Sequence, residues 1–333
     1  MSEPLRIGVL GAARINELAI LEPARLTGTR LVAVAARDRA RAKTYAQQNG
    51  FERALDSYAA VIKDPQIEAI YNPLPNSLHA PWNLAAIRAG KHVLSEKPFA
   101  SNAEEARLVA DAAQGSGLVV FEAFHYTYHP GFQRFLDIIS DGTIGELQHL
   151  RVAMTFPCED LADVRWSWPL SGGALMDLGC YCLHAIRTVA TRQGGKPTLV
   201  SVDTGRREGA HPEIDAWADV ELTLPSGARA TAEANLNAPR NNSMTATGSR
   251  GRVHLADFIT PRADDRLIIS RYDGETVEHL GRRTTYTYQL EAFAAAVRGG
   301  RPFPTTAPDA VANMALIDGC YRAAGLPLRR SAS

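Results

Sequence analysis

Short apolar segments alternate with helical ones over the first third of the chain, and this alternation restricts the possible folds more than any other feature. The apolar runs 6–10 and 31–36 are each followed by a segment of helical character. Parallel strands need a crossover helix between them, so the pattern predicts βαβ units and a doubly wound parallel sheet. Further strands are expected at 53–55, 67–74, 92–94 and 118–122, and helices up to about Leu26 and at 39–49, 80–89 and 102–115.

After residue 122 the pattern changes to longer strands joined by turns. Val220, Leu222 and Leu224 alternate with polar residues, and Pro225-Ser226-Gly227 then predicts a hairpin turn. We therefore expect an α+β domain with a large open, mostly antiparallel sheet. Its strands are expected at 147–156, 220–224, 228–236, 252–258, 267–272 and 276–280, and its helices at 131–140, 288–298 and 308–324. The predicted domains are 1–122 and 123–333.

Composition narrows the class of protein. A chain of 333 residues is too long for one ordinary core, which agrees with two domains. Lys+Arg and Asp+Glu balance at 36 each without a basic cluster, which argues against nucleic acid as a partner. No apolar run is long enough to span a membrane, and the first residues do not resemble a signal peptide. The four cysteines form no Cys-x-x-Cys motif, so we expect reduced thiols, no metal site and a cytoplasmic location.

The turn after the first strand is where a doubly wound sheet binds the pyrophosphate of a dinucleotide. Its sequence is Gly11-Ala12-Ala13-Arg14-Ile15, and its small residues let backbone donors approach phosphates. Asn16 stands where a third glycine is usual, so a tight turn without a ligand is the alternative. The end of the second strand bears on the cofactor, because arginine suits NADP and a carboxylate suits NAD. Arg37 favours NADP(H), with Asp38 capping the next helix, whereas Asp38 on the ribose would favour NAD(H).

Two further strand ends point to the same edge of the sheet. The segment Leu74-Pro75-Asn76-Ser77-Leu78-His79 is expected to bring backbone groups near the nicotinamide ribose. Asn76 or Ser77 is expected to cap the next helix, and His79 is either a ligand contact or an ordinary helix residue.

Ser95-Glu96-Lys97-Pro98 follows the strand 92–94, which places a lysine in the ligand crevice. Pro98 stiffens that turn, and Ser101 with Glu104 predicts a capping box. A surface turn with a solvated Glu96–Lys97 pair is the alternative.

One segment of the second half combines a glycine pair with an acid, a phenol and an imidazole. It runs from Gly172-Gly173 to His184, and on a helix Asp177, Tyr181 and His184 would share one face. Such a face suits proton transfer and hydroxyl binding, and the alternative is that these are capping and surface groups. Arg165 and Trp166, just upstream, are expected to add a polar clamp and an apolar wall.

Together these motifs resemble the Gfo/Idh/MocA oxidoreductases over nearly the whole chain. The resemblance rests on the turn 11–15, on 75–79, Glu96-Lys97-Pro98, 122–124 and 172–181, and on the closing segments 289–293 and 308–324. It implies a dinucleotide domain, a second domain whose open sheet often forms a homo-dimer or homo-tetramer, a catalytic Lys97, and a Lys97-Pro98 bond that can be cis. Four residues after Asp177, where some members carry histidine, this chain has Tyr181, and in this it resembles the dihydrodiol dehydrogenase and glucose–fructose oxidoreductase branches.

The resulting hypothesis is reversible hydride transfer between NADP(H) and a secondary alcohol or ketone on a ring of a sugar, deoxysugar or dihydrodiol. Tyr181 would be the acid/base, because a nearby Lys97 ammonium favours the phenolate. Glu96 is expected to organise the backbone near the nicotinamide, while Lys97, Asp177, His184, Arg165 and Trp166 line the substrate site. A dinucleotide-retaining glycosidase or a sugar- and NADP-sensing regulator of the same fold is the alternative. Thr127 stands where many relatives have arginine, which leaves the nicotinamide-side contacts less defined.

Overall fold

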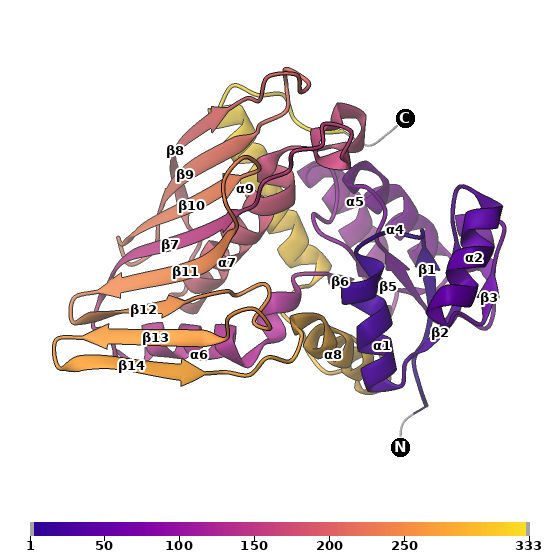
Figure 1. Cartoon of the computed structure of the whole chain (residues 1–333), viewed down its shortest axis with the longest axis horizontal. Coiled ribbons are helices and arrows are strands. Elements are labelled where there is room, and N and C mark those ends of the chain that lie inside the picture. Colours follow the sequence, from indigo (N-terminus) through magenta and orange to yellow (C-terminus); the bar gives the residue numbers. More distant parts are fainter. Residues whose placement is uncertain (1–2, 331–333) are drawn as a thin grey trace. The chain divides into compact units, whose positions relative to one another are not determined.

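A computed structural model describes residues 3–330, and its first part forms the predicted parallel sheet (Figure 1). The six strands lie in the order β3-β2-β1-β4-β5-β6, all paired in parallel. The chain adds β2 and β3 on one side of β1 and then β4, β5 and β6 on the other side. Doubly wound sheets bind ligands at this change of direction, between β1 and β4. The strands are β1 Arg6–Leu10, β2 Arg30–Ala35, β3 Arg53–Ala54, β4 Ala69–Asn72, β5 His92–Ser95 and β6 Val120–Glu122.

Helices connect these strands, as the alternation predicts. They are the π-helical η1 Glu17–Leu21, α1 Glu22–Thr27, α2 Arg39–Asn49, α3 Tyr58–Lys63, the 3-10 turn η2 Asn76–Leu78, α4 His79–Arg88 and α5 Ala103–Ala113. Asp38 caps α2 as predicted, because its side chain accepts the Arg41 amide at 2.6 Å. The capping prediction for α5 was wrong by one residue. Asn102 accepts the Glu105 amide at 3.0 Å, and Glu105 accepts the Ser101 amide at 3.1 Å.

The second sheet has eight strands in the order β14-β13-β12-β11-β7-β10-β9-β8. Every pair is antiparallel except β7 with β10, which confirms a mostly antiparallel sheet. The predicted hairpin at 225–227 joins β9 to β10, and Gly227 has a φ of 86° there. The strands are β7 Leu147–Thr155, β8 Thr198–Gly205, β9 Trp217–Thr223, β10 Arg229–Asn235, β11 Asn241–Gly248, β12 Gly251–Leu255, β13 Arg266–Arg271 and β14 Gly274–His279. The sequence had not indicated β8 or β11.

Helices α6 and α7 cover one face of this sheet (Figure 1). The inward side chains of β9 and β10 are buried, and Arg151, Glu233, Arg229 and Glu221 form ion pairs across strands on the other face. The remaining elements are η3 His125–Tyr128, α6 Pro130–Ser140, η4 Val164–Trp166, η5 Trp168–Leu170, the π-helical η6 Leu175–Gly179, α7 Cys180–Arg192, α8 Thr285–Gly299 and α9 Ala307–Ala323.

Contacts divide the chain into two units whose boundaries differ from those predicted. The first unit contains 3–125 and returns for Tyr286–Ala312, and the second contains Tyr126–Thr285 and Asn313–Arg330. Phe121 of β6 explains the return, because it stacks on Phe303 at 3.9 Å and meets Phe293 edge-on at 5.2 Å. The sequence prediction had assigned all of 123–333 to the second domain.

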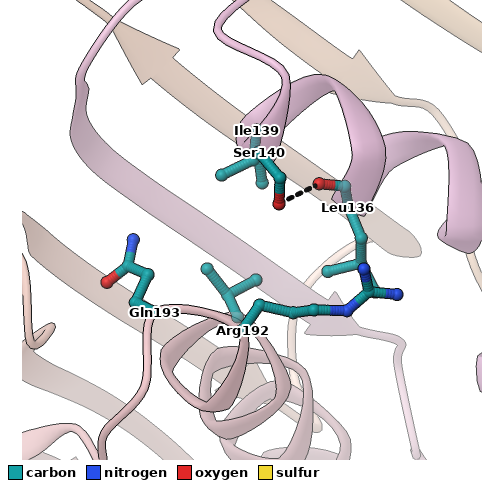
Figure 2. A pocket seen from close by; sticks show the side chains of 6 residues that line it. Leu136, Ile139, Ser140, Arg192 and Gln193 are labelled. Atoms are coloured by element: carbon teal, nitrogen blue, oxygen red, sulfur yellow. Dashed lines mark hydrogen bonds between the residues drawn. The ribbon is translucent and has the colours of Figure 1, made fainter.

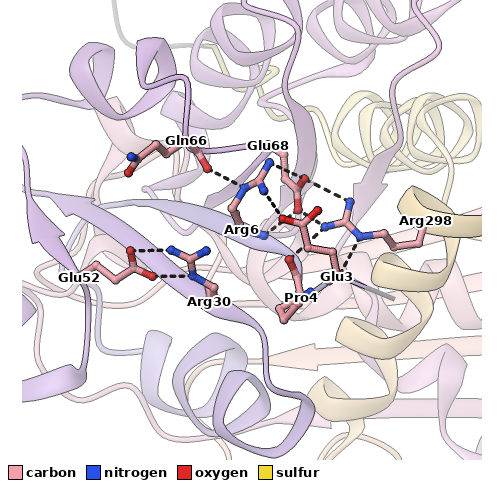
Figure 3. Close-up of polar contacts among 8 residues, drawn as sticks. All are labelled: Glu3, Pro4, Arg6, Arg30, Glu52, Gln66, Glu68 and Arg298. Carbon is pink, nitrogen blue, oxygen red and sulfur yellow. Dashed lines mark hydrogen bonds and ion pairs between the residues drawn. The ribbon is translucent and has the colours of Figure 1, made fainter. Parts of the chain in front are cut away.

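Charged groups fasten the start of the chain to α8 within the first unit (Figure 3). Glu68 pairs with both Arg6 and Arg298, and Arg298 also donates to the carbonyl oxygens of Glu3 and Pro4 at 3.0 and 3.1 Å. Within residues 3–330, no helix has the length and apolar character needed to cross a membrane. All four cysteines are buried thiols.

Candidate active site

The turn between β1 and η1 has the conformation that a dinucleotide-binding turn needs. Gly11 has a φ of 111°, and a Cβ there would lie 3.2 Å from Leu74, so only glycine fits. Asn16 Nδ2 donates to the Gly11 carbonyl at 2.9 Å, and Arg41 Nη2 donates to the Ala12 carbonyl at 2.8 Å. In a trans peptide the N–H points opposite to the C=O, so the Ala12 and Ala13 amides point away from these side chains. Asn16 therefore shapes the turn at the position where a third glycine is usual.

Arg37 and Arg41 lie close to the same turn. Both side chains are exposed. Burial raises the pKa of the Tyr58 hydroxyl, and the charges of Arg37 and Arg41 offset part of that rise. The Tyr58 hydroxyl lies 3.9 Å from the place of a Gly11 Cβ. Two cations thus stand beside the turn, of which only Arg37 was predicted from the sequence. Arg14 is exposed and Ala13 and Ile15 are half-buried in the turn itself.

The segment after β4 is held by buried polar groups. Asn76 and Ser77 lie inside the 3-10 turn η2, and Leu78 stands at the N-cap position of α4, where Asn76 or Ser77 was predicted. His79 is 1% exposed, and its Nδ1 and Nε2 lie 2.6 Å from the carbonyl oxygens of Pro98 and Leu74. Burial, together with the Lys97 charge, lowers the pKa of His79 to about 4. Because a carbonyl oxygen only accepts, the neutral ring donates to one of the two at a time.

Lys97 lies directly after β5, at the predicted edge of the sheet. It is half-buried, and the Lys97-Pro98 peptide bond is cis, as the resemblance implied. Burial of His125, together with the Lys97 charge, lowers the pKa of His125 to about 3. His125 is fully buried and packs on Tyr286 with ring centroids 3.8 Å apart. Lys97 is therefore a cation flanked by two imidazoles that stay neutral near pH 7.

Glu96 is buried in the core, so the alternative of a solvated surface pair does not hold. It is 6% exposed, and its Oε1 accepts the Tyr71 hydroxyl at 2.9 Å. Burial and the Glu96 carboxylate raise the pKa of Tyr71 well above its usual value, so Tyr71 remains a donor. Ser95 belongs to a chain of side-chain bonds in which Asn83 donates to Ser95 and Asn72 donates to Asn83, each at 2.8 Å. These buried bonds fix the backbone on which Lys97 stands.

In the second unit, the segment from Gly172 to His184 is helical but not one continuous α-helix. It opens with the π-helical turn η6, which has more residues per turn than an α-helix, and continues as the α-helix α7. Asp177 Oδ2 accepts Arg165 Nε at 2.6 Å, and Asp163 accepts Arg165 Nη1 at 3.0 Å. The carboxylate of Asp177, opposed by burial, raises the pKa of Arg165 above its usual range. The predicted polar residues Arg165 and Asp177 are thus brought together as an ion pair.

Tyr181 and His184 both lie close to Tyr126. His184 Nδ1 lies 2.6 Å from the Tyr126 hydroxyl, and the Tyr126 and Tyr181 ring centroids are 6.0 Å apart. Tyr181 and His184 are each 2% exposed. Tyr126 is therefore a partner that the sequence analysis missed, although it precedes the noted Thr127.

Trp166 occupies a buried position at the end of η4. It is 4% exposed, its Nε1 donates to the Cys158 carbonyl at 3.1 Å, and the Arg207 guanidinium lies 5.3 Å from its ring centroid. A separate hollow of about 270 Å³ lies between α6 and α7 (Figure 2). None of the predicted site residues lines it; its lining is Leu136, Ile139, Ser140, Val189, Arg192 and Gln193. Among residues 3–330, no group of three or more His, Cys, Asp or Glu side chains is arranged to hold a metal ion.

Models of known protein families match both parts of the chain. Residues 5–124 match the model of an oxidoreductase family with an NAD-binding Rossmann fold, and residues 132–254 match the GFO/IDH/MocA C-terminal domain. The chain belongs to the Gfo/Idh/MocA family of oxidoreductases. It is accordingly an enzyme of the dehydrogenase and reductase class.

Similar proteins of this family act on sugars, deoxysugars and a dihydrodiol. The chain is 31% identical to the D-xylose 1-dehydrogenase (NADP(+)) 2 of Haloferax volcanii, over 96% of this chain and 97% of that protein. It is 32% identical to the trans-1,2-dihydrobenzene-1,2-diol dehydrogenase of Bos taurus, over 76% and 74%.

A solved 3-ketoreductase from Actinomadura kijaniata, in complex with NADP and TDP-benzene, has a TM-score of 0.88 and 28% identity, over 96% of this chain and 98% of that one. That ketoreductase has also been solved with a tyrosine and with a lysine substituted.

Proposed function

We propose that this protein is an NADP-dependent oxidoreductase that transfers hydride between the nicotinamide and a secondary alcohol or ketone on a sugar-like ring. The observation that carries the proposal is Lys97, a cation fixed at the carboxyl end of β5 by the buried bonds of Glu96 and by the Pro98 carbonyl's contact with His79. Similarity to sugar and deoxysugar reductases and to a dihydrodiol dehydrogenase supports the substrate class.

The residues of the first unit fit a dinucleotide. The turn 11–15 would hold the pyrophosphate through its amides, since Gly11 leaves no room for a side chain and its carbonyl is turned toward Asn16. Arg37 and Arg41 would take the 2′-phosphate, because Asp38 already accepts an amide of α2. Backbone groups of Leu74, Pro75 and Asn76 would lie along the nicotinamide ribose. Bound NADPH supplies the hydride for reduction.

In this mechanism the chain's own residues bind the ring and move a proton. Tyr181 gives a proton to the carbonyl oxygen in reduction and takes one from the hydroxyl in oxidation, a role worth about 10²–10⁴-fold in rate. The Lys97 ammonium stabilises negative charge on that oxygen. Asp177, oriented by Arg165, accepts a hydrogen bond from a neighbouring ring hydroxyl. His184 and Trp166 support this arrangement from buried positions.

The test is a substrate screen followed by two substitutions. NADPH oxidation with keto-sugars and a dTDP-linked 3-ketodeoxysugar, and NADP⁺ reduction with D-xylose and a trans-dihydrodiol, should reveal turnover at the nicotinamide absorbance. Lys97→Met and Tyr181→Phe should each lower kcat about 10²-fold or more while leaving the Kd for NADPH within about twofold. A near-normal rate in either variant would remove that residue from the mechanism. Tight NADPH binding without turnover on any substrate would instead favour the glycosidase or the regulator.

Cofactor choice has its own measurement. We expect tighter binding of NADPH than of NADH, and Arg37→Ala should weaken NADPH binding about tenfold and leave NADH binding nearly unchanged. Tighter NADH binding by the unsubstituted enzyme would overturn the assignment of Arg37.

The proposal extends to assembly and location. We propose a homo-dimer or homo-tetramer formed through the open, charged face of the second sheet, which sedimentation equilibrium would test. The four buried thiols suit a reducing compartment, so we place the enzyme in the cytoplasm.

A further inference from the structure

A buried ion pair lies at the start of the helix that carries Asp177 and Tyr181. Arg329, the fifth residue from the end of the sequence, places its Nη2 2.6 Å from Asp215 Oδ1, and both side chains are 0% exposed. The guanidinium packs 4.2 Å from the Tyr321 ring centroid and 4.6 Å from that of Trp168. Charges are expensive to bury, and such a pair is weak evidence for stability alone. A role beyond stability therefore has to be sought in what the pair holds.

Arg329 and Asp215 bind the backbone of three of the four residues of the segment Gly172–Leu175. Arg329 Nε donates to the Gly172 carbonyl at 2.8 Å, and Asp215 Oδ2 accepts the Leu175 amide at 2.6 Å. The Asp215 carbonyl accepts the Ala174 amide at 2.8 Å. A planar guanidinium is suited to this task, because one rigid fork reaches both a carboxylate and a carbonyl. The segment from Gly172 to Leu175 is thereby fastened on the side of Arg329.

The glycine pair allows this close approach. Gly173 has a φ of 128°, and a Cβ there would overlap Asp215 Oδ1 and lie 2.9 Å from Arg329 Nη2. A Cβ on Gly172 would overlap the Arg165 carbonyl, which accepts the Gly173 amide at 2.9 Å. Arg165 is also the partner of Asp177. One side of the segment is therefore held by Arg329 and Asp215, and the other by Arg165.

We propose that Arg329 is a positioning residue, which acts through Asp215 and the Gly172–Leu175 backbone to fix Asp177 and Tyr181 for the reaction. Leu175 begins η6, Asp177 lies two residues further and Tyr181 lies in the first turn of α7. Movement at Gly172 would therefore reach the acid/base and hydroxyl-binding groups, and misplacement by about 1 Å can cost about 10²-fold in rate. This inference rests on the function proposed above for those two residues.

The decisive variant is the double substitution Arg329→Met with Asp215→Asn. It removes both charges, so no buried charge is left without a partner, and it keeps a side chain at position 215 that can accept the Leu175 amide. Arg329→Lys keeps the positive charge, but a single ammonium lacks the fork that serves Asp215 and Gly172 together. Arg322→Met is the matched control, because Arg322 lies on α9 with its side chain 64% exposed and 3.8 Å from Asp318.

We expect the double variant to fold, to bind NADPH with unchanged affinity and to lose about 10²-fold in kcat. Arg329→Lys should lose about tenfold in kcat, and the control should keep its full rate. Amide hydrogen exchange over residues 172–181 should accelerate about tenfold or more in the double variant only. A folded double variant with the original kcat, or with unchanged exchange over 172–181, would overturn the inference. If the unsubstituted enzyme turns over no substrate, the proposed function fails, and the exchange measurement still decides whether Arg329 fixes the segment.

Discussion

The contact between Arg165 and Asp177 predicts that the two residues act as one group in the second unit. Replacing Arg165 by Met keeps most of the side chain's length and apolar stem but removes the guanidinium. The variant would lose the 2.6 Å bond to Asp177 and the 3.0 Å bond to Asp163, so each of the two carboxylates would lose a charged donor. Because Asp177 is 9% exposed, water compensates only part of that loss.

The expected size follows from these contacts. Charge-assisted hydrogen bonds contribute about 1.5–3 kcal/mol each, and partial exposure of the Arg165 side chain (29%) reduces the sum. We therefore expect Arg165→Met to lower the free energy of unfolding by about 2–3 kcal/mol, and Asp177→Asn by about 1 kcal/mol because an amide oxygen still accepts. The double variant should lose less than the sum of both, with a coupling energy of about 1 kcal/mol.

Denaturant unfolding of the four proteins and steady-state kinetics on the same samples provide the assay. In kinetics we expect Arg165→Met to lower kcat/KM for the ring substrate about 10–10²-fold while the Kd for NADPH stays constant, because Arg165 orients the carboxylate that holds the ring. Strictly additive losses in the double variant, in both stability and kcat/KM, would refute the reasoning and show that Asp177 does not depend on Arg165.

Three further predictions concern other parts of the structure. Asn16→Gly would bring the turn closer to the usual glycine pattern, yet it should weaken NADPH binding about fivefold, because the Gly11 carbonyl loses its 2.9 Å donor; unchanged affinity by fluorescence titration would count against the role of Asn16. Gly173→Ala should lower the free energy of unfolding by about 3 kcal/mol or more, because a Cβ there meets Asp215. Gly194 is also at positive φ (80°) but has open space around it, so Gly194→Ala should cost only about 1 kcal/mol. Equal losses of stability in thermal unfolding would show that crowding by Asp215 is unimportant. Burial tends to raise the pKa of Glu68, but bonds from Arg298 and Arg6 outweigh burial and the pKa is lowered. The carboxylate therefore contributes about 1 kcal/mol of stability above pH ~4.5, and this contribution is lost as the pH falls through the lowered pKa. Glu68→Gln should reduce stability at pH 7 and show a weaker dependence of stability on acid pH, and parallel curves of stability against pH for both proteins would contradict this.

The parallel sheet was predictable because each of its strands carries a local signal. Buried strands such as β2 read as continuous apolar runs, and helices must separate parallel neighbours. Strand β11 has no such signal, since Asn241–Gly248 is mostly small and polar. It pairs on one side with β7, about 90 residues earlier in the chain, and on the other side with β12, the next strand in the chain. Pairing over such distances is not visible in local periodicity, which explains why β11 and β8 were missed.

The candidate site was predictable where a residue type itself carries the chemistry, and not where a partner decides its role. Lys97, Asp177 and Tyr181 stand out because of their functional groups and positions. The spacing of Asp177, Tyr181 and His184 suggested a single stripe, but the π-helical turn η6 breaks the α-helical period, and Asp177 turns to Arg165 while His184 turns to Tyr126.

The buried polar residues of the two units suggest why so much of the site escapes sequence patterns. A buried polar group is costly unless it is hydrogen-bonded, so each must find a partner of matching geometry. Tyr71 finds Glu96 across 25 residues and Arg329 finds Asp215 across 114. In both units these bonds lie on the segment that leads into a proposed functional side chain, Lys97 in one and Asp177 in the other. Such partners are chosen by the folded backbone, so a substitution at Tyr71 or Arg329 should affect the enzyme's rate although neither residue carries a motif.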